Sequence, residues 1–296
     1  MAGNFILSCE STVDMPYSYI SGRDIPVLFY TYVINSEECI DDMGRDPEAL
    51  PEFYRKLKEG GLPKTSAVNY AKYLEYFDEL LKKGDVLHVT LGSGMTSSVA
   101  NAEKAAEELR TKYPDRKITV VDSLGSSTGY GMLVDDAADL RDEGKSMEEV
   151  TEWLLANRNR IHHQFLSTDL QYYRRGGRIS GAAATVGAIL NICPMMRINS
   201  DGKIIAYTKV RGKKNAIKET IATMKRLCDD HENYSGKCFV NHSNCLADAE
   251  LTVSMLHEQF PNIKGEIKIC DIGTIIASHT GPGTISVFFH GEERVK

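Results

Sequence analysis

The sequence lacks the paired cysteines that mark disulfide frameworks and structural zinc sites. Its seven cysteines are odd in number and scattered, with no C-x-x-C pair, so we expect most to be buried small hydrophobic residues and predict no metal site. No apolar run approaches the roughly 18 residues needed to cross a bilayer. The first residues also lack the basic and apolar regions of a signal peptide. A cytoplasmic location with only transient membrane contact is therefore expected.

An excess of positive charge is also missing. The 41 acidic and 35 basic residues give a net charge of -6, which argues against nucleic acid as a partner. The sequence has no G-x-x-x-x-G-K-[ST] loop, so a self-contained kinase with that ATP site is not predicted. Hydrophobic residues make up 42% of the chain, as in folded proteins. A length of 296 residues favours two domains.

The first half alternates β-rich and helical segments. We predict strands at residues 4–9, 25–34, 85–90 and 118–122, and helices at 51–58, 70–83, 99–113, 130–141 and 147–158. This rhythm predicts an α/β domain with a mainly parallel sheet flanked by helices, with the functional loops at the carboxyl ends of its strands.

The pattern changes after residue 159, where antiparallel strands are expected. Ser200-Asp201-Gly202 predicts a hairpin between two β-rich runs. We therefore predict an N-terminal α/β domain over residues 1–158 and a C-terminal mixed α/β domain over 159–296. Predicted strands cover residues 163–168, 193–199, 203–210 and 285–290, and predicted helices cover 180–190, 214–228 and 247–259.

Hydroxyl-rich loops follow several predicted strands. They are residues 8–12, 91–98 and 122–129, and a further pair, Thr65-Ser66, precedes a helix. Helix N-termini with free N–H groups and hydroxyl side chains suit anions. Capping of the following helix alone explains any single one of these loops.

His279 lies in a predicted loop before a Gly-Pro-Gly turn. The turn would hold the imidazole in place, where it could donate to a carboxylate or phosphate or serve a purely structural role. Two basic clusters, at residues 174–178 and 209–214, could be solvated surface or a docking patch for an acidic partner.

A serine hydrolase is the alternative enzyme hypothesis. Residues 125–129 match G-x-S-x-G between a strand and a helix, with Ser127 as the nucleophile. Asp271 and His279 follow in the order of that enzyme class. The match is short, and Ser/Gly-rich loops are common.

The order of several motifs along nearly the whole chain resembles the DegV family of fatty-acid-binding proteins. The motifs are Ser11-Thr12-Val13-Asp14, Pro63-Lys64-Thr65-Ser66, Gly94-Met95-Thr96-Ser97-Ser98, Val121-Asp122-Ser123, the run 170–180, Val210-Arg211-Gly212 and His279-Thr280-Gly281-Pro282-Gly283. Each motif is weak alone, and together they are fairly specific.

The resemblance implies a fatty acid, such as palmitate, stearate or oleate, held between the two domains. It implies a carrier rather than an enzyme, with no cofactor, that presents the carboxylate to a separate ATP-dependent fatty acid kinase subunit for acyl phosphate formation. By position, Thr65, Ser66, Thr96, Ser97 and His279 would lie at the carboxylate. Arg211 and Arg174 would face the kinase.

Two residues depart from the family pattern. Glu10 stands where the family has Asp, and Ser97 replaces a glycine in the ligand loop, which can alter the local backbone. Burial of a C16 tail gains on the order of 12 kcal/mol before ordering and association costs. We therefore expect neutral hydroxyls to be sufficient for the head group, without an arginine clamp.

Overall fold

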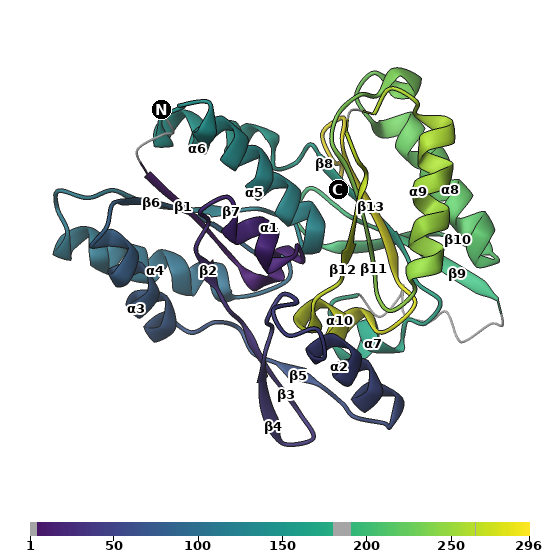
Figure 1. Ribbon diagram of the computed structural model, residues 1–296, viewed down its shortest axis with the longest axis horizontal. Helices are drawn as coiled ribbons and strands as arrows, with labels where there is room; N and C mark the ends of the chain where they lie inside the picture. Colours follow the sequence, from purple (N-terminus) through teal and green to yellow (C-terminus); the bar gives the residue numbers. More distant parts are fainter. Residues whose placement is uncertain (1–4, 180–190, 264) are drawn as a thin grey trace.

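A four-stranded parallel sheet, in the order β2-β1-β6-β7, forms the centre of the N-terminal domain. The computed structural model describes residues 5–179, 191–263 and 265–296, and Figure 1 shows this sheet beside that of the C-terminal domain. Helices cover both faces, so β6 is almost wholly buried, which explains why Val86 packs on one face of the sheet and Leu87 and Val89 on the other. The strands are β1 (Phe5–Glu10), β2 (Val27–Leu28), β6 (Asp85–Thr90) and β7 (Ile118–Asp122).

The helices of this domain divide between the two faces of the sheet. On one face, Tyr73, Phe77 and Leu80 of α3 pack with Val86 and Ile118 of the sheet. Helices α1, α5 and α6 cover the other face. The helices are α1 (Tyr17–Ser21), α3 (Tyr70–Leu81), α4 (Ser98–Lys112), α5 (Ser127–Asp142) and α6 (Met147–Asn157).

A small antiparallel sheet, β4-β3-β5, extends from this domain (Figure 1). The prediction of one strand over 25–34 is wrong, because β2 and β3 belong to different sheets. Between them, the Tyr30 N–H donates to the Ser11 hydroxyl (3.1 Å) instead of continuing the ladder. Phe53 of the neighbouring helix packs edge-on against Tyr32. The elements are β3 (Thr31–Ile34), β4 (Glu37–Ile40), β5 (Lys64–Thr65), α2 (Ala49–Lys58) and the 3-10 helix η1 (Ser11–Val13).

A six-stranded mixed sheet, β10-β9-β8-β13-β11-β12, forms the C-terminal domain. Its pairs are antiparallel except β11 with β12. The predicted hairpin joins β9 and β10, with Gly202 at φ 73°. The strands are β8 (Ile161–Leu166), β9 (Ile192–Ile198), β10 (Ile204–Arg211), β11 (Cys238–His242), β12 (Lys268–Asp271) and β13 (Ile285–His290).

Helices α8 and α9 pack on one face of this sheet, as Figure 1 shows. Helices α7 and α10 lie near the small sheet, below the junction of the domains in this view. The predicted helix at 180–190 lies outside the described residues. No helix among those that are described is long and apolar enough to cross a membrane. The elements are α7 (Gln171–Arg175), α8 (Lys213–Leu227), η3 (His231–Asn233), α9 (Leu246–Gln259) and α10 (Thr274–Thr280).

Helix α5 packs against both sheets and joins the two domains. A Cβ atom at Gly129 would lie 2.4 Å from His163 Nε2 and 2.6 Å from Phe288 Cδ1, so the glycine allows the helix to approach the second sheet closely. Helix α6 ends at Asn157 and β8 begins at Ile161, and the boundary predicted at 158/159 falls in the turn between them. The predicted α/β architecture, with a parallel sheet followed by a mixed sheet, is confirmed.

Candidate ligand cavity

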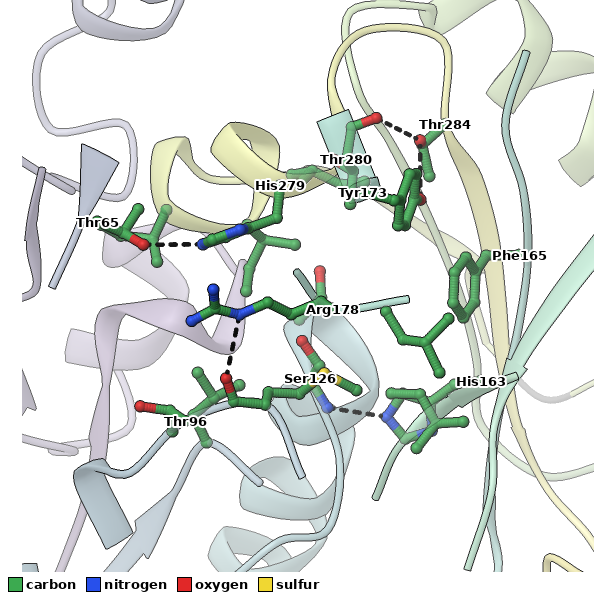
Figure 2. A pocket seen from close by; sticks show the side chains of 18 of the residues that line it. Thr65, Thr96, Ser126, His163, Phe165, Tyr173, Arg178, His279, Thr280 and Thr284 are labelled. Atoms are coloured by element: carbon green, nitrogen blue, oxygen red, sulfur yellow. Dashed lines mark hydrogen bonds between the residues drawn. The ribbon is translucent and has the colours of Figure 1, made fainter. Parts of the chain in front are cut away.

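An apolar cavity lies where the two domains and the small sheet meet. Its side chains surround about 810 Å³ of space, including the part open to solvent. Strands β8, β9, β10 and β13 line it from the C-terminal domain, and the loop after β6 and the start of α5 line it from the N-terminal domain (Figure 2). Its apolar side chains are Ala67, Leu91, Met95, Phe165, Ile198, Ile204, Ile272, Ile275, Ile276 and Phe288.

One end of the cavity is polar and is organised around His279. The Nε2 atom of His279 lies 2.8 Å from the Thr65 hydroxyl oxygen, whereas its buried Nδ1 has no hydrogen-bond partner in the described part of the chain. Burial, together with the positive charge of Arg178, lowers the pKa of His279 to about 4. The imidazole is therefore neutral at physiological pH. A proton on Nε2 would leave the Thr65 hydroxyl free to donate to a ligand.

The prediction that His279 lies in a loop is wrong. It lies in the last turn of α10, and the turn with Gly281 at φ 65° follows. The helix starts where the Asp41 carboxylate accepts hydrogen bonds from the N–H (3.0 Å) and hydroxyl (2.8 Å) of Thr274. Because Asp41 is more than 200 positions away in the sequence, no local pattern indicates this cap.

The Thr96 loop forms the opposite side of the polar end. The Thr96 hydroxyl accepts from the Ser98 N–H (3.1 Å) and contacts the Ser98 hydroxyl (2.9 Å), so it also shapes the start of α4. Ser66 and Thr96 line the cavity with Thr65 and His279. Ser97 is exposed and is not among the lining residues. The structure thus brings four of the five predicted residues together.

Arg178 is a cavity residue that the sequence reasoning did not assign. Figure 2 shows its guanidinium directed between His279 and Thr96, with Nε donating to the Met95 carbonyl (3.4 Å) and Nη1 to the Gly176 carbonyl. Arg178 therefore joins the predicted hydroxyl residues and His279 in the wall of this cavity. The sequence feature that could indicate the place of Arg178 is the pair of glycines before it. A Cβ atom at Gly176 would lie 2.2 Å from His279 Nδ1, so only glycine allows the segment before Arg178 to lie this close to His279.

Comparison with known proteins agrees with this architecture. A family model described as "Uncharacterised protein, DegV family" matches residues 7–292. The chain belongs to the DegV family. A DegV domain-containing protein of Clostridium perfringens is 37% identical over 293 residues, which cover 98% of each chain.

Two solved structures share the DegV fold over almost their full length. A Thermus thermophilus DegV family protein, described for its fatty acid binding, has 27% identity and a TM-score of 0.83, covering 98% of this chain and 100% of that one. The Streptococcus pneumoniae fatty acid kinase (Fak) B3 protein, loaded with linoleic acid, has 19% identity and a TM-score of 0.83 with the same coverage. At that identity the second likeness shows the fold alone.

In this DegV chain the residues of the hydrolase hypothesis do not form a triad. The Ser127 hydroxyl donates to Asp14 Oδ2 and accepts from Asn241 Nδ2 (2.7 Å). Asp271 lies 3.5 Å from His242 Nε2, and its side chain is 61% exposed. His279 contacts Thr65 instead. Among the residues that the structure describes, no histidine is hydrogen-bonded to Ser127 as the base of that enzyme class would be.

The two arginines predicted to dock a partner are on the surface of the DegV fold. Arg211 ends β10 and Arg174 lies in α7, and both side chains are exposed. Neither lines the cavity. Within the described residues, no group of three or more His, Cys, Asp and Glu side chains is arranged to hold a metal ion.

Proposed function

We propose that this protein is a carrier that encloses the tail of a long-chain fatty acid and holds its carboxylate at the Thr65, His279 and Arg178 end of the cavity. The observation that carries the proposal is a cavity whose exposed surface is mostly apolar, with Thr65, Thr96, Arg178 and His279 grouped on one side of it (Figure 2). Fatty acid binding described for the Thermus thermophilus relative supports it. Palmitate, stearate and oleate match the chemistry of such a cavity.

The balance of forces favours retention of the ligand by its tail. Each buried methylene contributes about 0.8 kcal/mol, so a C16 chain supplies most of the gross affinity. The head group contacts the neutral His279–Thr65 pair, the hydroxyls of Ser66 and Thr96, and the charge of Arg178. Because Arg178 is exposed, solvent screens its charge, so the head group can be held without being sealed from a second protein.

Mass spectrometry of lipid extracted from natively purified protein tests the carrier proposal. One fatty acid per chain is expected. Delipidated protein should take up added palmitate or oleate, measured by isothermal titration. The absence of bound fatty acid together with no uptake would refute it.

We infer further that the carrier presents the carboxylate to a separate fatty acid kinase subunit, which forms the acyl phosphate. The exposed Arg211 and Arg174 suit docking of an acidic surface, because neither is required to line the cavity. The Arg211→Ala variant should keep its palmitate affinity yet be phosphorylated about tenfold more slowly, as expected for loss of one charged contact. Arg116→Ala, at another exposed arginine, is the matched control. Equal loss of binding and phosphorylation would contradict a docking role.

A further inference from the structure

A second groove between the domains contains two buried carboxylates, Asp14 and Asp41. Asp14 follows η1 and is 4% exposed, and Asp41 follows β4 and is 1% exposed. The function proposed above uses neither carboxylate as a ligand contact. Both lie at the start of α10, the helix that carries His279 at its other end.

Each carboxylate has one oxygen that is hydrogen-bonded and one that is not. Asp14 Oδ2 accepts from Ser127, and Asp41 Oδ1 accepts from Thr274. Asp14 Oδ1 and Asp41 Oδ2 are buried and have no hydrogen-bond partner of normal geometry within the described residues. A buried carboxylate oxygen with no donor is costly.

The two side chains converge on a single residue, Gly273. A Cβ atom at this position would lie 2.6 Å from Asp14 Oδ1 and 3.0 Å from Asp41 Oδ1. Asp41 Oδ2 would lie 3.5 Å from the same Cβ atom, so both oxygens of Asp41 are within about 6 Å of Asp14 Oδ1. Two ionised carboxylates this close in a buried site repel each other strongly, and a single proton removes that repulsion.

In the described part of the chain, neither carboxylate forms an ion pair with a lysine, arginine or histidine, and no such cation is a main cause of either pKa shift. The other ionisable groups that face the pair are the carboxylates of Asp271 and Asp42, the phenols of Tyr32 and Tyr54, and the Cys270 thiol. Of the cations that line the groove, Arg45 stacks over the Phe29 ring at 4.2 Å and Arg55 pairs with Glu52. Lys58 and His242 line the same groove, and His242 is paired with Asp271.

We propose that Asp14 and Asp41 hold one proton between them and act together as a latch that fixes the first turn of α10, and through it His279. Protonation of either carboxylate leaves a single negative charge in the site, which relieves the repulsion between the two. In agreement, burial and then the charge of Asp41 raise the pKa of Asp14 well above its usual range. Burial also raises the pKa of Asp41, although hydrogen bonds from Ser11 and Thr274 oppose the rise.

The latch reaches the ligand cavity through a short rigid path. Thr274 is the first residue of α10, and Ile275 and Ile276 line the cavity. His279 lies in the last turn of the same helix, beside Thr65. Asp41 and Asp14 are therefore positioning residues, which act on the head-group site through α10. Their effect on ligand affinity rests on the proposed carrier function, whereas the shared proton does not.

The proton can be observed directly in protein labelled with carbon-13 at the aspartate carboxyl carbon. In wild-type protein at pH 7, one aspartate signal should have the chemical shift of a protonated carboxyl. It should disappear in Asp14→Asn and in Asp41→Asn, since either change leaves a single carboxylate beside an amide donor. It should persist in Asp271→Asn, the control at a neighbouring exposed carboxylate. Fully ionised aspartates in the wild type, or one bound divalent cation per chain by elemental analysis, would overturn the proposal.

Palmitate titration then tests the latch separately. Asp41→Ala removes the cap of α10 and should weaken palmitate binding roughly tenfold, whereas Asp41→Asn keeps an acceptor for Thr274 and should restore most of the affinity. Equal affinities for wild type and Asp41→Ala would show that the pair does not position His279. If the wild type bound no fatty acid at all, the carrier proposal would fail. The carbon-13 signal of the carboxyl group would still show whether Asp14 and Asp41 hold a proton.

Discussion

The imidazole of His279 contacts the hydroxyl of Thr65 at 2.8 Å, although 214 positions separate the two residues in the sequence. Thr65 comes from the small sheet of the N-terminal domain, and His279 comes from α10 in the C-terminal half. The contact therefore forms only when the small sheet and α10 are in place. A ligand that binds this pair should stabilise their packing, because it binds the folded state alone.

Thr65→Val should weaken palmitate binding about 5- to 20-fold, which corresponds to about 1–2 kcal/mol for a lost hydrogen bond. The change removes the hydroxyl and nearly preserves the side-chain volume. Thr65→Ser keeps the hydroxyl and should bind like the wild type. Isothermal titration with palmitate measures both. A palmitate affinity of Thr65→Val equal to that of the wild type would show that this hydroxyl does not bind the carboxylate.

Arg178→Met should weaken binding about tenfold at low salt, as expected for loss of a partly screened charge-assisted contact. It should also make the affinity nearly independent of ionic strength, because the wild-type contact is electrostatic. Arg178→Lys should retain much of the salt dependence. Displacement of a fluorescent fatty acid over a series of salt concentrations checks this. Equal salt dependence in Arg178→Met and the wild type would contradict the assigned role.

Ile198→Phe should alter the preference for acyl chain length. Ile198 is buried in the cavity wall beside Phe165 and Met196, so a larger ring occupies space that the tail needs. We expect stearate to lose at least tenfold more affinity than laurate, and overpacking to cost about 1–3 kcal/mol of folding stability. A uniform loss for both lipids would indicate general disruption instead of a shorter cavity.

Stability should fall as the pH drops below about 6.5. Burial lowers the pKa of His162 and His279 to about 4 and that of His163 well below its usual range. The unfolded chain therefore binds these protons first, and the stability present above the unfolded pKa is lost as the pH falls toward the folded values. Urea unfolding between pH 7.5 and 4.5 measures the slope. His162→Gln should reduce it, and an unchanged slope would show that this histidine is not responsible.

The sequence predicts the parallel sheet well because its strands and helices carry local signals. The buried face of α3, with Tyr73, Phe77 and Leu80, repeats at helical spacing, and the 200–202 turn has a hairpin sequence. The short strands β11 and β12 were not predicted, since five- and four-residue strands offer little periodicity. Their pairing depends on neighbours distant in sequence.

The sequence predicts the candidate site only in part, because some of its contacts also depend on residues that are distant in sequence. Thr65, Thr96 and His279 were placed by family resemblance, whereas composition and spacing alone indicated only helix caps. Arg178 was assigned to a surface cluster because its approach to the cavity depends on the contact of Gly176 with His279. The helical setting of His279 depends on a cap from Asp41, which no local pattern encodes.

The close packing of α5 bears on how a ligand could enter. The helix touches the second sheet at Gly129, and its Asp135 and Asp136 pair with Lys237 of the C-terminal domain. Hinge opening of the two sheets would have to break these ion pairs and expose Phe288 to water. We therefore expect lipid exchange to occur through local rearrangement around α7 and α10, with α5 as the fixed frame, so that the two domains keep one orientation in the loaded and the empty protein.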